Sequence, residues 1–175
     1  MRNLLAIFAL LTTIGCSTTR PQQTGLDPTT RPGGEAVASV GAVCYPPAGW
    51  KAEPLKKSAR HTHQIWLSPT GHTAYGVIHF SLPWPVGPDL VLSAFLHEMQ
   101  KQEGEARLLD KSSDPRLPGL RFEAQGTVYH LWGNLKVKGW EGWAVYAGSR
   151  TGEPILLPEL ELAAAAREST RVGTP

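Results

Sequence analysis

The sequence 63-HQIWLSPTGHTAYGVIHFSLP-83 predicts a β-hairpin and decides much of the fold. Two runs rich in β-branched and aromatic residues flank the tetrapeptide SPTG (68–71), a turn signal with proline in a favoured position. If these four residues form the loop, Leu67 lies opposite His72 and Ile65 lies opposite Ala74. Apolar residues occupy alternate positions on both faces of the hairpin. We therefore expect a sheet that is covered on both sides.

The period of two in a strand assigns the apolar residues of the hairpin to its two faces. One face carries Ile65, Leu67, Ala74, Ile78, Phe80 and Leu82. The other carries Trp66, Tyr75 and Val77.

A helix is predicted after the hairpin, from about Asp89 to Glu103. Asp89 suits the N-cap position, and Gly104 suits the C-terminal end of the helix. An apolar stripe at i, i+3, i+4 and i+7 consists of Leu92, Phe95, Leu96 and Met99.

Several antiparallel strands and a second helix are predicted in the remaining sequence. Strand-like runs are ARLLD (106–110), LRFEA (120–124), TVYHLW (127–132), NLKVK (134–138) and WAVYAGS (143–149), with a polar loop at 111–119. Gly133-Asn134 and KGWEG (138–142) are both candidate turns. The closing helix is expected from about Pro158 to Ser169, since proline suits a first helical turn. This order of elements predicts the α+β class, with an antiparallel sheet flanked by helices.

The stretch YPPAGW (45–50) resembles the opening of PsbP-like (Mog-type) domains, in which a Pro-rich turn and a Gly-Trp pair follow the first strand. The resemblance continues through the hairpin, LVLSAFLHEMQKQEG (90–104), LPGLRFEA (117–124) and EGWAVYAGS (141–149), and covers roughly Val43 to Ser169. It implies a PsbP-like α/β/α sandwich. The family includes a photosystem subunit, a GTPase-binding protein and many bacterial lipoproteins, mostly accessory or binding proteins. Their functional residues are not shared across the family, so none is transferred to this chain.

The N-terminus, MRNLLAIFALLTTIGCSTTR, has the charged start and short apolar run of a secretory signal peptide, predicted over residues 1–15. Its end, TIGC (13–16), resembles the lipobox of bacterial lipoproteins, although Thr13 replaces the usual large aliphatic residue. The resemblance implies that Cys16 carries a lipid anchor. An ordinary cleaved signal with a chance cysteine remains the alternative.

Residues 16–39 are predicted to be the lipidated N-terminus and a disordered tether, because they are rich in Thr, Pro, Gly and Gln and lack apolar periodicity. A flexible coil of this length spans roughly 25 Å. Residues 40–172 suit a single domain. From residue 40 onward the chain has 14 Lys plus Arg and 13 Asp plus Glu, so we expect no nucleic-acid partner. The expected location is the cell envelope, on the periplasmic side or at the outer membrane, with the lipid as the membrane contact.

The second cysteine, Cys44, lies in CYPPAGW (44–50). Because Cys16 is assigned to the lipid, no intramolecular disulfide is expected. Pro46 and Pro47 stop the first strand, and Trp50 is expected to pack back on the core. We expect Cys44 to be buried and inert, since no basic residue beside it in sequence lowers the pKa of its thiol. An exposed Cys44 would allow an intermolecular disulfide.

The histidines do not form a recognisable metal site in the sequence. HTH (61–63) places two imidazoles on one side of a strand, but the expected register puts His72 too far along the hairpin, and His79 points to the other face. We expect these histidines to be solvated. HEMQK (97–101) lacks the second histidine of a zinc-protease motif, so His97 is expected to face solvent. No metal and no cofactor are predicted.

No GxSxG, P-loop or GxGxxG motif is present, and no catalytic residue is assigned. Most tryptophans suit sheet packing, but KGWEGW (138–143) places Trp140 between two glycines on a candidate loop. Trp140 and Trp143 are therefore the candidate residues for binding an envelope protein or a glycan. The function expected is a non-catalytic binding or accessory role. A hydrolase with a dispersed active site and a small-ligand carrier remain alternatives.

Overall fold

The structure is a computed structural model that describes residues 35–37, 40–113 and 119–173. The predicted signal peptide, Cys16 and most of the predicted tether lie outside these residues. No helix in the described part of the chain is both long enough and apolar enough to cross a membrane.

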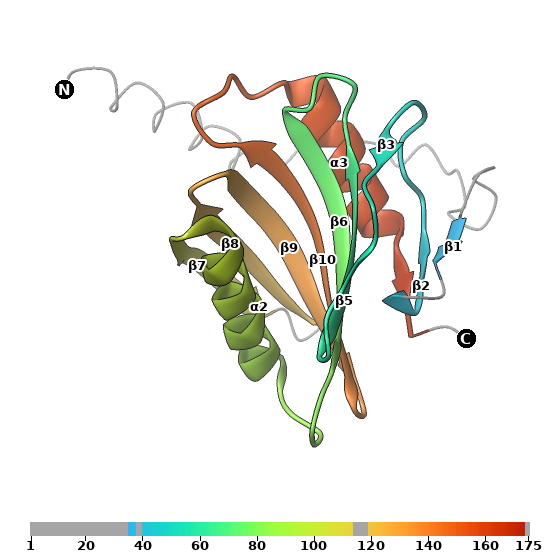
Figure 1. The fold of residues 1–175 in the computed structure, drawn as a ribbon, viewed down its shortest axis with the longest axis vertical. Coiled ribbons are helices and arrows are strands. Elements are labelled where there is room, and N and C mark those ends of the chain that lie inside the picture. The colour runs from blue at the N-terminus through green and yellow to red at the C-terminus, as the bar shows by residue number, and fades with distance from the viewer. Residues whose placement is uncertain (1–34, 38–39, 114–118, 174–175) are drawn as a thin grey trace. The chain divides into compact units, whose positions relative to one another are not determined.

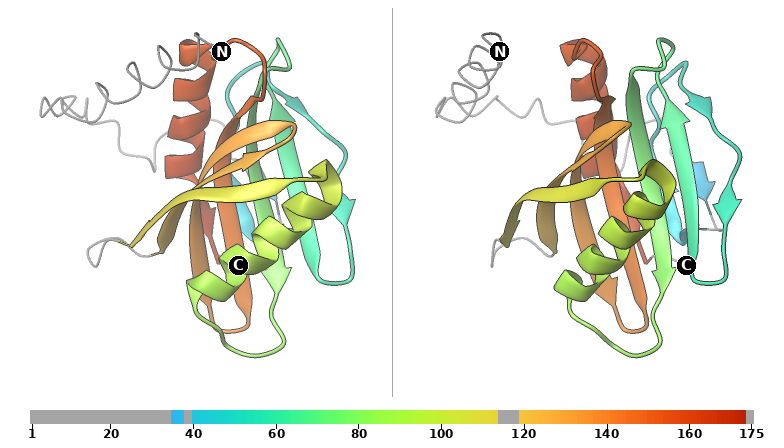
Figure 2. Two further views of the ribbon diagram at one scale, coloured as in Figure 1. Left: turned by 90° about the vertical axis from the view of Figure 1, so that its left-hand side faces the viewer. Right: turned by 60° about the vertical axis from the view of Figure 1, so that its left-hand side comes forward.

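The main sheet is antiparallel throughout and has the strand order β3-β5-β6-β10-β9-β8-β7, with β4 also paired to β5 (Figure 1). Its strands are β3 (Lys51–Ala52), β4 (Lys56–Lys57), β5 (His61–Leu67), β6 (Thr73–Ser81), β7 (Ala106–Ser113), β8 (Leu120–Gly126), β9 (Tyr129–Lys138) and β10 (Glu141–Arg150). Helix α2 (Pro88–Glu103) covers one face of this sheet and helix α3 (Leu157–Ser169) covers the other (Figure 2). This arrangement confirms the predicted α+β class.

A small second sheet joins the two ends of the domain. It consists of β1 (Glu35–Val37), β2 (Ala42–Cys44) and β11 (Arg171–Val172), with β2 in the middle. Strand β1 lies within the segment predicted to be a tether, so the folded part begins before the expected residue 40. Its three residues pair with β2, a partner that composition alone does not reveal.

Two apolar cores lie on the two faces of the main sheet. The first packs α2 against the sheet and includes Ile78, Phe80, Val91, Leu92, Phe95, Met99, Phe122, Leu131, Leu135 and Tyr146. The second packs α3 and the small sheet against the opposite face and includes Val40, Cys44, Trp66, Tyr75, Val77, Trp143, Ala163 and Ala166. The division of the hairpin residues between the two cores confirms the predicted faces.

The register of the β5–β6 hairpin differs from the predicted one by two residues. Leu67 pairs with Ala74 rather than with His72, and the loop runs over residues 68–72. The hydroxyl oxygen of Ser68 accepts a hydrogen bond from the Thr73 amide at 3.2 Å, and Gly71 has a φ of 75°, so the loop is wider than a four-residue turn. Because side chains alternate with a period of two, this shift leaves every residue on its predicted face.

Helix α2 begins one residue earlier than predicted. Its N-cap is Gly87 and Pro88 occupies the first turn, which suits the fixed φ of proline. Asp89 is not the cap; its carboxylate lies 2.7 Å from the ammonium group of Lys111 on β7. Gly104, with a φ of 86°, ends the helix as predicted.

Of the two candidate turns in the later strands, one is confirmed and one is wrong. Gly139 and Trp140 connect β9 to β10, with a φ of 61° at Gly139. Gly133 and Asn134 instead lie inside the continuous strand β9. A side chain at Gly133 would collide with the ring of Phe122, so this glycine leaves room for an aromatic residue of the neighbouring strand.

Candidate functional site

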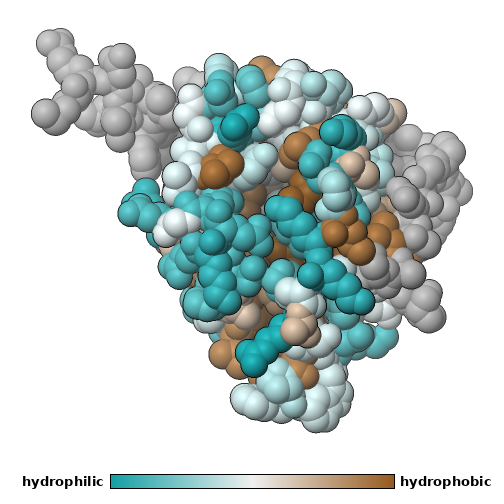
Figure 3. All heavy atoms as spheres, viewed as in Figure 1, coloured by the Kyte–Doolittle hydropathy of each residue, from teal (hydrophilic) through white to brown (hydrophobic). Residues whose placement is uncertain are grey.

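A cavity of about 570 Å³ lies between α2 and the main sheet, where β4, β5, β6, β9 and β10 contribute lining residues. Most of its wall is apolar, and polar residues surround its mouth. Figure 3 shows hydrophobic residues recessed between hydrophilic ones on this side of the molecule. The residues that line the cavity are Lys56, Lys57, Ser58, His61, His63, Ile65, Ala74, Ile78, Phe95, Glu98, Met99, Gln102, Glu103, Val128, Tyr129, Leu131 and Tyr146.

His63 is the most buried histidine of this wall, with 5% of its surface exposed. Its Nε2 atom lies 2.5 Å from the hydroxyl of Tyr146, which is also buried. Burial, followed by the positive charges of Lys56 and His61, lowers the pKa of His63 to about 3, so the ring is neutral at neutral pH. Burial raises the pKa of Tyr146, which therefore keeps its proton.

The hydrogen bond between these two residues determines the tautomer of His63. The Nδ1 atom is buried and has no hydrogen-bond partner within the part of the chain that the structure describes. If the hydroxyl of Tyr146 donates to Nε2, the proton of the neutral ring is on Nδ1, and this N–H is the single unsatisfied donor of the pair. The opposite assignment would leave the hydroxyl proton of Tyr146 and Nδ1 both without partners. We therefore assign a proton to Nδ1 of His63, in the wall of the cavity.

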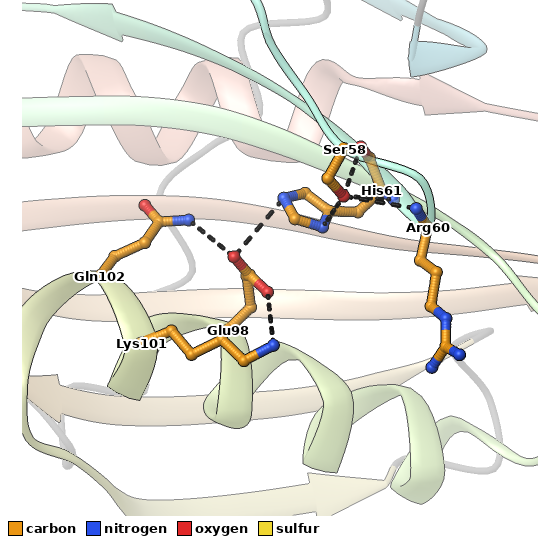
Figure 4. A network of polar contacts seen from close by, with 6 residues as sticks. All are labelled: Ser58, Arg60, His61, Glu98, Lys101 and Gln102. Carbon is orange, nitrogen blue, oxygen red and sulfur yellow. Dashed lines mark hydrogen bonds and ion pairs between the residues drawn. The ribbon is translucent and has the colours of Figure 1, made fainter.

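A polar network, drawn in Figure 4, includes the cavity-lining residues Ser58, His61, Glu98 and Gln102. The side chain of Glu98 on α2 lies 3.7 Å from Nε2 of His61 and 3.9 Å from the ammonium group of Lys101. Gln102 donates a hydrogen bond of 3.3 Å to the same carboxylate. The hydroxyl of Ser58 lies 2.7 Å from Nδ1 of His61. The network thus connects α2 to the β4–β5 turn across the cavity mouth.

Ser58, His61 and Glu98 have the residue types of a serine-hydrolase triad, and they lie in one cleft. However, the hydroxyl oxygen of Ser58 accepts hydrogen bonds from the backbone amides of Arg60 and His61, at 3.3 and 3.2 Å. These amides stabilise the turn and are not left to hold an oxyanion. The distance of 3.7 Å from His61 to Glu98 is also too long for a hydrogen bond. The geometry suits a structural turn better than a nucleophile.

The expectation that the histidines are solvated is wrong for His61 and His63. His61 lies against Glu98 of α2 and Phe80 of β6, and His63 lies against Tyr146 of β10. His79 lies on the other face, as predicted, where its ring stacks on Trp143 at 5.2 Å between centroids. His97 is exposed, as predicted. Within the described residues, no three side chains of the metal-binding types form a cluster.

Two exposed tryptophans lie at one end of the domain. Trp140, in the β9–β10 turn, is 59% exposed, and Trp84, in the loop between β6 and α2, is 60% exposed. The two segments are joined by a backbone hydrogen bond of 2.8 Å from the Leu82 amide to the Trp140 carbonyl. We call this surface the tryptophan end.

Trp143 does not belong to this surface. It is 1% exposed, and its indole N–H donates a hydrogen bond of 2.8 Å to the carbonyl of Val40. The prediction that Trp143 binds a partner is therefore corrected, because the residue holds the segment before β2 against the main sheet. Cys44 is 0% exposed and interacts with the side chain of Tyr75, which confirms a buried thiol and disfavours an intermolecular disulfide.

The fold is similar to the solution structure of cyanobacterial PsbP (CyanoP) from Synechocystis sp. PCC 6803. The two chains share 12% sequence identity with a TM-score of 0.54, over 79% of this chain and 90% of the other. No protein-family model matches the sequence, and none of the curated proteins matches it. At this identity the likeness shows the fold, and the domain has the PsbP-like fold that the sequence predicted.

Proposed function

We propose that this chain is a lipid-anchored protein of the cell envelope with a non-catalytic, accessory role, and that it binds a protein partner through the tryptophan end. The lipobox-like TIGC sequence supports the anchor at Cys16. The PsbP-like fold supports the accessory role, since the family that the sequence resembles consists mostly of accessory and binding proteins.

The exposure of Trp140 and Trp84 is the observation that carries this proposal. Two large aromatic side chains on adjoining loops expose 59% and 60% of their surfaces, whereas Trp66 and Trp143 are almost fully buried. Tryptophan is enriched among the residues that dominate the energy of protein interfaces. A rigid sheet end that presents two of them suits a docking surface for a protein.

The test is proximity labelling with affinity capture from intact envelopes. The wild type is compared with Trp140→Ala and Trp84→Ala, and Leu157→Ala is the matched control, because Leu157 is 57% exposed at the start of α3. We expect a partner protein that both tryptophan variants lose and the leucine variant keeps. Recovery of the same proteins by all variants would overturn the proposal, as would loss of a glycan alone.

A second candidate function, a small-ligand carrier, is favoured by the cavity between α2 and the sheet. Its volume of about 570 Å³ falls within the range of sites that enclose small ligands, and its wall is mainly apolar. This function does not compete with the first, because the cavity and the tryptophan end involve different residues.

The hydrolase alternative is weaker than both. It is favoured by the proximity of Ser58, His61 and Glu98, but the backbone amides beside the Ser58 hydroxyl are already bonded to it.

A further inference from the structure

Two hydrogen-bond donors of the cavity lie on paired residues and have no acceptor among the described residues: one, on Lys56, is exposed, and the other, on His63, is buried. Lys56 of β4 pairs directly with His63 of β5, and paired residues of antiparallel strands present their side chains on the same face. Both residues line the cavity. Among the described residues, the ammonium group of Lys56 has no hydrogen bond or ion pair, and Nδ1 of His63 has no partner. The two groups can therefore converge on one acceptor.

The carboxylates of the cavity are already bonded within the protein. Glu98 interacts with His61, Lys101 and Gln102. One oxygen of Glu103 accepts hydrogen bonds from the backbone amides of Val128 and Tyr129, at 2.9 and 3.2 Å. The polar capacity that remains in the cavity is thus mainly that of donors. A ligand that completes it must supply an acceptor.

The unsatisfied Nδ1–H of His63 is the feature that the fold alone does not explain. A buried donor without an acceptor destabilises a protein, and most buried polar groups have a partner. Tyr146 holds the ring in place through Nε2, and Nδ1 has almost no accessible surface, so a ligand reaches it only when the cavity wall adjusts. Such an arrangement is expected where a ligand provides the missing acceptor.

We propose that the cavity binds an amphipathic carboxylate, such as a long-chain fatty acid. The carboxylate accepts hydrogen bonds from Nδ1 of His63 and from the ammonium group of Lys56. The apolar chain packs against Ile65, Ile78, Phe95 and Leu131, which belong to the cavity wall. This inference rests on the carrier function proposed above and adds the chemical class of the ligand.

The test uses the fluorescent fatty acid cis-parinaric acid and its methyl ester as probes. The protein is the full-length chain carrying Cys16→Ala, so that neither a bilayer nor a detergent takes up the probe. Lys56→Gln removes the proposed charge contact. Lys51→Gln is the matched control, because Lys51 loses the same charge outside the cavity, where it lies 3.6 Å from Glu53. Ile65→Trp fills the cavity, and thermal unfolding verifies that each variant is folded.

We expect the acid to bind more tightly than the ester, and Lys56→Gln to weaken binding of the acid roughly tenfold, as for a hydrogen bond to a charged group. Lys51→Gln should leave the affinity unchanged, and Ile65→Trp should abolish binding of both probes. His63→Phe provides a second variant of the head-group contact, with the same expected loss for the acid.

The outcomes separate the two proposals. If neither probe binds, or if a folded Ile65→Trp variant binds them as the wild type does, the carrier function is wrong for this cavity. If both probes bind and Ile65→Trp abolishes binding, but Lys56→Gln and His63→Phe bind the acid as tightly as Lys51→Gln, the cavity is a carrier site and the carboxylate assignment is overturned.

Discussion

The hydroxyl of Tyr146 reaches Nε2 of His63, at 2.5 Å, although β6 separates the strands that carry the two residues. Gly76 makes this contact possible. It is the β6 residue that pairs with Tyr146, and a side chain there would collide with the tyrosine ring. The ring of Tyr146 therefore lies across a position without a side chain, and one hydrogen bond connects β10 to β5.

Gly76→Ala should destabilise the protein, because the added methyl group displaces the ring of Tyr146. We expect a loss of about 1–3 kcal/mol in the free energy of unfolding, the usual range for overpacking a core. Urea denaturation measures it. In a double-mutant cycle, Tyr146→Ala should remove most of this cost, since it removes the colliding ring. An unchanged cost in that background would contradict the role given to Gly76.

Stability should fall with pH below about 6.5 because of His63. The pKa of His63 is lowered from 6.5 to about 3 in the folded state, so the unfolded chain binds the proton first as the pH falls. The stabilisation is fully present above 6.5 and is lost between 6.5 and about 3, with a slope of about 1.4 kcal/mol per pH unit. We expect His63→Gln, which keeps an acceptor for Tyr146, to show a shallower slope in denaturation experiments across this range. Equal slopes would show that His63 accepts a proton in the folded protein.

Ser58 should not react with a fluorophosphonate probe. Its hydroxyl oxygen accepts hydrogen bonds from the backbone amides of Arg60 and His61. These two amides are therefore not free to bind an oxyanion. The measurement compares labelling of the wild type with labelling of Ser58→Ala. Labelling that depends on Ser58 would support the hydrolase and contradict a non-catalytic role.

Cys16→Ala should prevent lipidation and leave either unprocessed precursor or protein released from the membrane fraction. The physical reason is that the buried CH₂ groups of the acyl chains supply the membrane affinity, at about 0.8 kcal/mol each. Metabolic labelling with palmitate and fractionation measure both effects. Cys44→Ala is the matched control, because Cys44 is buried in the domain. Palmitate incorporation that persists in Cys16→Ala would locate the lipid elsewhere.

The sequence predicted the faces of the central hairpin better than its register. The face on which a side chain lies follows from the period of two along the strand, so the neighbours Val77 and Ile78 lie on opposite faces. The register depends instead on the length and geometry of the loop. The loop of residues 68–72 is held by a hydrogen bond of the Ser68 side chain, which no residue pattern specifies. The prediction of a turn at Gly133 is wrong for a similar reason. The sequence alone does not distinguish a glycine that makes room for a neighbouring side chain, here Phe122, from a glycine that turns the chain.

The candidate site was largely beyond prediction from the sequence. The cavity joins Lys56, His63, Glu98 and Tyr146, which come from β4, β5, α2 and β10. Only the histidines were singled out in the sequence, and they were expected to be solvated. Their burial depends on contacts with Tyr146 of β10 and Glu98 of α2, which are distant in the sequence and which a local pattern cannot report. The exposed Trp140 was predictable, because the glycines on either side of it are a local turn signal.

The small sheet has a consequence for when the domain can fold. Strand β2 is held between β1, the first strand of the domain, and β11, the last, so its pairing is completed by residues at opposite ends of the domain. Contacts of such large sequence separation form slowly, since a long loop must close first. During synthesis, one edge of β2 stays unpaired until Arg171 and Val172 have been made. The small sheet is therefore complete only after β11 has been made, and a truncation that removes β11 is expected to leave an edge of β2 open to pairing with other chains.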